Sequence, residues 1–466
     1  MIKKFLLLSL VVSQLTISCS SDDDNNTEDP TTPDKELTLE EEIANIIKQP
    51  YSSLPPEQQK IKLEAEANDM LVQLDKTKSS SAIEAIENLL SLLSENAIDI
   101  FDGKNDNEIE DILNMADVYG VYTWNNTNKS WAKTASTTEL KFVFPAKSSQ
   151  SANNAIFTAK SVASNIKVKI TDSNGNWQYN EETNEWVLGG YVNDYMFLPT
   201  SSDATLTIDN TQVATFAQTA SYNGNEAPVD FTYKMTLNDG YSWDISGKKA
   251  AQNNTAKAVF TYNGKNLVSF TAGSTTDIDA LLTDDELTQY RGKGNGLVQI
   301  LDNFVIIADI DLAAEAIDDA ALENIPYPAY PDYSSPNADF KGFFTARNAY
   351  EKKYSEGSAA NFNKNIKLTL ISRKDGSKIA DIVQVAEKDG GYYDSIPVWV
   401  PSEWYENGGY WSNNQDSEQF FREYYTENYY LNFKDNTQVA MSVYFSEGFD
   451  DLLDKFDDFI NRFEKK

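Results

Sequence analysis

The stretch FTYKMTLNDG at residues 231–240 decides the fold class of this 466-residue chain. Its first seven residues alternate strictly between apolar and polar side chains, which places each kind on its own face of a β-strand. The Asp239-Gly240 pair that follows favours the positive φ angles of a tight hairpin turn. A strand with one buried and one solvated face is typical of antiparallel sheets, so the stretch predicts part of an antiparallel meander.

The same alternation of apolar runs and turn dipeptides continues on both sides of this stretch. Asn223-Gly224 and Asn263-Gly264 are further hairpin signals. The strands that we expect lie at 118–124, 140–144, 166–170, 204–208, 213–220, 231–237, 256–262, 267–271, 366–371, 379–385, 429–433 and 439–445. Residues 297–310 are apolar enough for either a strand or a buried helix, and periodicity does not decide between them.

Helical spacing of apolar residues appears on either side of these strands. It runs through residues 36–117, returns at 277–290 and 312–322, and ends in an amphipathic stretch at Phe449–Phe463. The sequence therefore predicts an α+β fold: an N-terminal helical segment, then antiparallel, hairpin-rich sheets with additional helices, and a C-terminal amphipathic helix. One arrangement of such elements is a curled sheet wrapped around helices, as in LolA-like lipid carriers.

Composition shifts divide the chain into five regions. The proline-rich segment at 325–331 is stiff and extended, which favours a boundary there. The regions are a signal peptide at 1–18, a disordered acidic tether at 19–35, a helical segment at 36–117, an antiparallel β-rich domain with helices near its end at 118–324, and a C-terminal α+β domain with an aromatic-rich loop at 325–466.

The N-terminus has the order of a secretory signal. Lys3 and Lys4 are followed by an apolar run at 5–12 and by the small-residue site Ser18-Cys19, and the run is too short to span a membrane. The segment resembles the signals of bacterial lipoproteins, although Thr16 stands where those signals usually carry leucine. The resemblance implies that Cys19, the chain's single cysteine, is lipidated and anchors the protein to the membrane.

A run of aspartates at residues 22–24 follows the anchor. It resembles the export tract of Bacteroidetes surface lipoproteins. The resemblance implies an outer-membrane lipoprotein exposed at the cell surface.

Charge and missing residue types exclude several functions. With 39 basic and 72 acidic residues the formal net charge is −33, which opposes binding to nucleic acid. There is no histidine, so Ser-His-Asp, Cys-His and histidine-zinc chemistry is excluded. The acidic segment at 102–108 fails the calcium-loop pattern, since Lys104 replaces a ligand and the sixth position is not glycine. We expect no metal site, no cofactor and no catalytic residue, and the composition favours a non-enzyme.

The most unusual window is 391–430, in which thirteen of forty residues are aromatic. Phe420, Phe421, Tyr424 and Tyr425 have the spacing of one helical face. A second set lies among proline and glycine in an expected irregular loop, where it forms either a packed mini-core or an exposed ligand platform. This set consists of Trp399, Trp404, Tyr405, Tyr410 and Trp411.

Three functions remain open at this point. The first is a non-catalytic binding or structural lipoprotein whose partner is an extracellular glycan or protein, bound on the aromatic platform. The second is a carboxylate-based glycoside hydrolase, for which Glu403 and Glu406 are the acids nearest to aromatic residues. The third is a carrier of apolar ligands inside a curled sheet.

Overall fold

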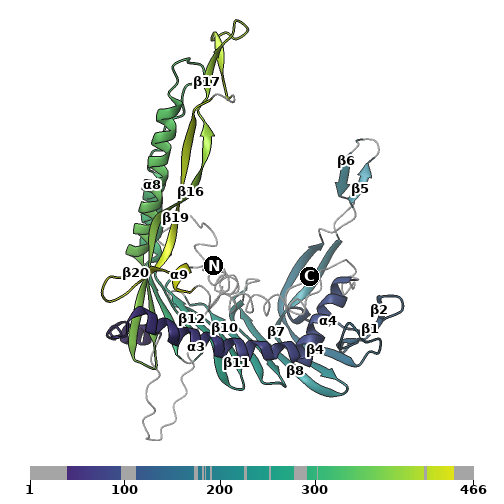
Figure 1. Ribbon diagram of the computed structural model, residues 1–466. Coiled ribbons are helices and arrows are strands. Elements are labelled where there is room, and N and C mark those ends of the chain that lie inside the picture. The colour runs from purple at the N-terminus through teal and green to yellow at the C-terminus, as the bar shows by residue number, and fades with distance from the viewer. Residues whose placement is uncertain are drawn as a thin grey trace.

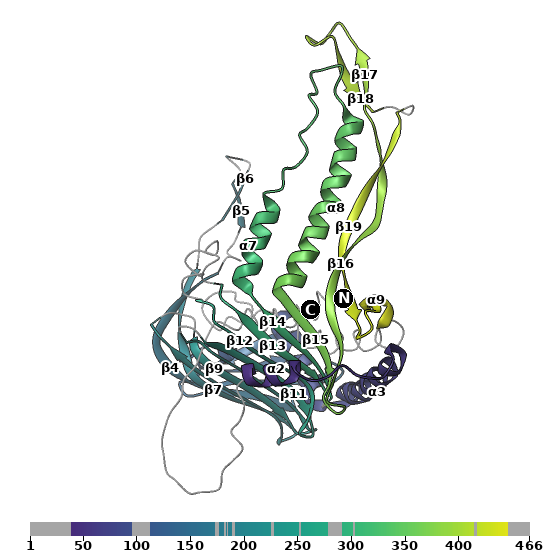
Figure 2. The same cartoon turned by 90° about the vertical axis from the view of Figure 1, so that its left-hand side faces the viewer.

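A computed structural model describes the chain from residue 39 to residue 445. Not described within that range are 96–111, 173–176, 181–182, 184, 189–191, 225–227, 251–252, 278–290, 302 and 414–416. Cys19, the signal region, the whole acidic tether and the expected helix at 449–463 lie outside the described residues. N-terminal helices precede a large, strongly curved sheet with further helices (Figures 1 and 2), so the predicted α+β class is confirmed.

The sheet has sixteen strands in the order β2-β1-β3-β4-β7-β8-β9-β10-β11-β12-β13-β14-β15-β16-β19-β20. Neighbours in it run antiparallel, apart from β1 and β3, which pair in parallel. The strands are β1 (Gly120–Asn125), β2 (Ser130–Thr134), β3 (Leu140–Phe144), β4 (Ala155–Asp172), β7 (Val192–Ile208), β8 (Thr211–Tyr222), β9 (Pro228–Leu237), β10 (Tyr241–Lys248), β11 (Asn254–Tyr262), β12 (Lys265–Ser274), β13 (Gly294–Ile300), β14 (Phe304–Ile310), β15 (Ile366–Ser372), β16 (Ser377–Ser395), β19 (Gln419–Asn432) and β20 (Gln438–Ala440).

One face of the sheet carries the main core. Helices α3 (Pro56–Asp75) and α4 (Ser81–Glu95), joined by the short 3-10 helix η1 (Lys76–Ser79), supply their apolar stripes to it. The start of α4 is capped by Ser80, whose Oγ accepts from the backbone N–H of Ile83 at 3.2 Å. The buried sheet residues beneath the helices include Tyr122, Phe142, Phe144, Phe157, Leu206, Phe216 and Tyr241.

The opposite face is covered near β13–β15 by helix α2 (Leu39–Ile47). Its Ile43 and Ile46 pack against Val305 and Ile307 of β14, whereas Phe304 of the same strand belongs to the cluster that includes Leu63 of α3. Burial on both faces explains why the segment 297–310 is largely apolar, and the structure shows it to lie in the two strands β13 and β14.

A long arm rises from one end of the sheet (Figures 1 and 2). We define the arm as residues 312–365 and 384–430: helix α7 (Leu312–Glu323), helix α8 (Phe340–Asn365), the outer parts of β16 and β19, and the hairpin of β17 (Val398–Pro401) and β18 (Gly409–Ser412). With 26 residues α8 is about 39 Å long. Asp339 caps it by accepting from the backbone N–H of Gly342 at 2.7 Å.

Two asparagines of α8 hold the helix to the edges of the β16–β19 hairpin. The Asn363 side chain donates to Gln384 O at 2.7 Å and accepts from Gln384 N at 2.8 Å. Asn348 does the same on the other strand, donating to Phe421 O at 2.9 Å and accepting from Glu423 N at 3.2 Å. Each side-chain amide hydrogen-bonds to the backbone at an open edge of the hairpin, as a neighbouring strand would. The helix therefore satisfies backbone N–H and C=O groups that would otherwise be free to pair with another chain.

The structure corrects the interpretation of the aromatic window. Phe420, Phe421, Tyr424 and Tyr425 do not form a helical face, because they lie in β19, where residues 419–428 pair with β16. The predicted irregular loop likewise contains the regular hairpin β17–β18. The helical spacing of these aromatics was accidental, since their cross-strand partners in β16 lie 26 to 37 residues upstream.

The expected boundary at residue 325 falls between α7 and α8. The sheet itself continues past it, because β14 pairs with β15 on the far side of the boundary. Among the described residues, no helix combines the length and the apolar character needed to cross a bilayer.

Candidate functional site: the aromatic end of the arm

The end of the arm is a short hairpin whose turn spans residues 402–408. The backbone N–H of Ser402 donates to Gly408 O at 2.9 Å, and that of Gly408 donates to Tyr405 O at 2.9 Å. Gly408 has a φ of +77°, which glycine adopts without steric cost. At Gly409 a Cβ would lie 2.4 Å from Val400 O and 2.7 Å from the Trp399 ring, so only glycine fits beneath that ring.

Trp399 and Trp411 fix this hairpin to the body of the arm. They are direct cross-strand partners, and their rings meet edge to face at 5.5 Å. The Trp411 ring also packs edge to face on Phe340 at the start of α8, with centroids 4.6 Å apart, and its Nε1 donates to Ser335 O at 3.1 Å. Both tryptophans are half-buried, so this pair of the predicted platform forms a small packed core.

The other three residues of the predicted platform face solvent. Trp404 is 96% exposed at the apex of the turn, and Tyr405 and Tyr410 are also exposed. The rings of Tyr405 and Tyr410 lie 5.1 Å apart and tilted by 35°, which holds them as one apolar surface beside the tryptophan. The turn also presents the exposed side chains of Glu403, Glu406 and Asn407.

Exposed aromatic side chains concentrate on the arm. Of the twelve in the described residues, nine lie there. Outside the turn they are Tyr327, Tyr330, Tyr333, Tyr392, Tyr393 and Tyr424. Solvated aromatic rings gathered on one projection are typical of an interaction surface.

Arg422 links the exposed end of the arm to α8. Its side chain is 6% exposed and lies over the rings of Phe344 and Tyr392, at 5.1 and 5.7 Å. Its Nη1 donates to Asp394 at 3.3 Å. Nearby, the Lys388 ammonium that donates to Glu423 lowers the pKa of that carboxyl. These contacts tie β16, β19 and α8 together below the tip of the arm.

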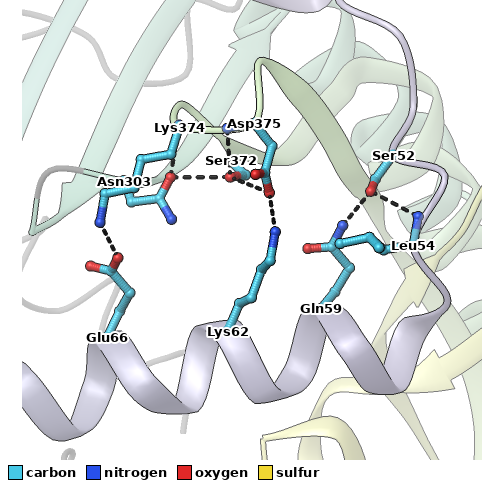
Figure 3. Close-up of polar contacts among 9 residues, drawn as sticks. All are labelled: Ser52, Leu54, Gln59, Lys62, Glu66, Asn303, Ser372, Lys374 and Asp375. Carbon is cyan, nitrogen blue, oxygen red and sulfur yellow. Dashed lines mark hydrogen bonds and ion pairs between the residues drawn. The ribbon is translucent and has the colours of Figure 1, made fainter.

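A second polar cluster lies at the foot of the arm (Figure 3), where α3 crosses the β15–β16 turn. A groove of about 340 Å³ is lined there by Lys62, Ala65, Glu66, Asp69, Asn303, Lys374 and Asp375. Asn303 is buried, and its Oδ1 accepts from the backbone N–H of Lys374 at 2.9 Å. The Ser372 hydroxyl lies 3.1 Å from the same oxygen and 3.0 Å from Asp375.

Two lysine–carboxylate pairs cross this groove. Lys62 donates to Asp375 at 2.8 Å, and Lys374 forms an ion pair with Glu66. The Lys62 ammonium lowers the pKa of Asp375, whereas a general acid needs a raised pKa. The cluster is therefore suited to fixing α3 against the sheet rather than to proton transfer.

The described residues give little support to the two alternative functions. Glu403 and Glu406, the acids nominated for a hydrolase, lie on the exposed turn, whereas the groove is lined by other residues near α3. A recess lined partly by Ile112, Met115 and Leu140 holds only about 10 Å³, which is less than an apolar ligand needs.

In the part of the chain that the structure describes, no three Asp, Glu, Cys or His side chains lie close enough together to hold a metal ion. Asp318, for example, accepts from Lys364 and Asn365 instead.

Comparisons with family models, curated proteins and solved structures find no match for this chain.

Proposed function

We propose that the protein is a lipid-anchored, cell-surface binding protein that holds an extracellular glycan on the aromatic end of its arm. The observation that carries the proposal is the arrangement of Trp404, Tyr405 and Tyr410, three solvated rings on a hairpin whose other two aromatics anchor it. The apolar faces of such rings stack on the C–H faces of sugars.

The surroundings of the rings favour a glycan over a protein ligand. The turn presents carboxylates and an amide at residues 403, 406 and 407, which can hydrogen-bond to sugar hydroxyls. A stable protein interface needs about 800 Å² from each partner, more than three rings on a single turn provide. The net charge of −33 favours a neutral sugar over an acidic one.

The anchor is the second part of the proposal, and it rests on the lipoprotein-like signal. Replacing Cys19 by alanine (Cys19→Ala) removes the only thiol that can carry the lipid. We expect the variant to leave the membrane fraction when cells are lysed and fractionated, because a lipidated protein is held by its acyl chains. Retention of Cys19→Ala with the membranes would show that the protein is held there in another way.

The aromatic site is tested by binding to an array of neutral glycans. A Trp404→Ala, Tyr410→Ala double variant should lose at least about tenfold in affinity, because aromatic hot-spot residues each contribute more than about 1 kcal/mol. A Tyr119→Ala variant serves as the matched control, since Tyr119 is an exposed aromatic outside the arm. Equal binding by wild type and double variant would contradict the site, and absence of binding to every glycan would contradict the function.

A further inference from the structure

A second projecting hairpin carries an exposed aromatic pair. It consists of β5 (Trp177–Asn180) and β6 (Glu185–Leu188), and it extends from the far ends of β4 and β7. Tyr179 and Trp186 are direct cross-strand partners with ring centroids 5.5 Å apart. Tyr179 is 48% and Trp186 64% exposed, so the pair lies largely in solvent.

The β1–β2 hairpin shows that such a pair need not be exposed in this protein. Trp124 and Trp131 are cross-strand partners there, with centroids 5.2 Å apart. Trp124 is buried and Trp131 packs on Phe142, with its Nε1 donating to Leu92 O at 3.1 Å. The two hairpins have the same pairing geometry, and only the one on β5–β6 presents its rings outward.

The β5–β6 hairpin also resembles the tip of the arm in composition. The segment NEETNE at 180–185 is rich in acidic and amide residues, as Glu-Trp-Tyr-Glu-Asn at 403–407 is on the arm. Both projections rise from the same side of the curved sheet in both views (Figures 1 and 2), and the arm reaches further. A flat partner surface would touch the arm first, whereas a flexible chain reaches both.

We propose that the β5–β6 hairpin is a second contact for the ligand of the arm, and that this ligand is therefore a neutral polysaccharide chain. The proposal rests on the glycan-binding function proposed above. From β7 to β16 there are nine inter-strand steps of about 4.8 Å, or about 43 Å along the sheet. Two small aromatic contacts on separate projections of the sheet suit a polymer of repeated units better than a single sugar, which can engage only one of them.

Bivalent binding makes a distinct prediction for chain length. Two weak sites on one polymer act through a high effective concentration, which raises the apparent affinity by about 10²–10⁴ when both engage. Trp186→Ala should therefore lower the affinity for the polymer at least about tenfold. It should leave unchanged the affinity for a short oligosaccharide that binds at the arm alone.

The experiment uses the full chain and a panel of soluble neutral polysaccharides, a mixed-linkage glucan, a mannan and a xylan, each with short oligosaccharides cut from it. Calorimetric titrations compare wild type, Trp186→Ala, Trp404→Ala and the control Tyr119→Ala. We expect both tryptophan variants to lose affinity for the polymer. We expect only Trp404→Ala to lose affinity for the oligosaccharide.

The failure of this inference is distinguishable from that of the proposed function. If Trp186→Ala binds polymer like wild type while Trp404→Ala does not, the second contact is refuted and the arm remains the binding site. If no polymer or oligosaccharide binds, or if both tryptophan variants bind all of them as wild type does, both proposals are refuted.

Discussion

Truncation of Phe142 to alanine should lower the free energy of unfolding by about 3–5 kcal/mol, the usual cost of deleting a buried phenylalanine ring. Phe142 is fully buried in the middle of β3. Its ring stacks on Tyr122 at 5.1 Å and meets Trp131 edge to face at 5.8 Å. Removing it leaves a cavity among the neighbouring aromatic rings of the sheet, which they cannot fill without leaving their own contacts.

Chemical denaturation measures this loss as a lower midpoint with an unchanged slope. Tyr424→Ala is the matched control, since that ring is 53% exposed on the arm, and its loss should cost less than about 1 kcal/mol. A Phe142→Ala variant that is as stable as Tyr424→Ala would contradict the packing of helices and sheet described above.

Replacing Asp394 by alanine should destabilise the arm by about 2–3 kcal/mol. Asp394 is the carboxylate partner of the nearly buried Arg422, and losing it leaves a cation between two aromatic rings. Breaking a fully buried pair costs about 3–5 kcal/mol. The expected value is smaller because the Asp394 side chain is 32% exposed.

Hydrogen exchange of the β16 and β19 amides measures this effect locally. Adding Arg422→Met to Asp394→Ala should restore part of the protection, since methionine fills the space between the rings without an unpaired charge. The ion pair would be irrelevant to the arm if Asp394→Ala exchanged at the wild-type rate. The account of Arg422 would also be wrong if the double variant were less protected than Asp394→Ala.

The sheet was largely predictable from the sequence because its signals are local. The alternation at 231–237 specifies a strand without reference to distant residues. The Asn263-Gly264 pair likewise specifies a hairpin turn, and its two residues have positive φ angles of 49° and 74°. The stripe expected on α3 follows the same logic. Its Leu63, Ala67, Met70, Leu71 and Leu74 are buried, whereas Ile61, expected in the same stripe, is 64% exposed.

The arm was not predictable in the same way. Helix α8 has no apolar stripe, because it packs through ring contacts such as Phe362 on Tyr429 and through the side-chain amides of Asn348 and Asn363. Sequence periodicity indicates helices through their apolar faces, so it gives no signal for this one. The role of these two asparagines could be predicted only if the position of the hairpin edges beside them were already known.

The sequence predicted the candidate site as a set of five residues, but it could not show which of them are packed and which are exposed. Trp399 and Trp411 pack inward because the hairpin register sets them opposite each other and Phe340 lies against Trp411. Trp404 projects because it stands in the turn. These outcomes depend on tertiary contacts with residues 335 and 340, which spacing within the window does not specify.

The central claim is that the exposed end of the arm is the surface that holds a neutral glycan. Oxidative footprinting of the full chain, with and without a saturating neutral polysaccharide, measures this surface directly. The account predicts that oxidation of Trp404, Tyr405 and Tyr410 falls on binding while that of Tyr119 stays constant. A bound polysaccharide that leaves the oxidation of these three arm residues unchanged would contradict it.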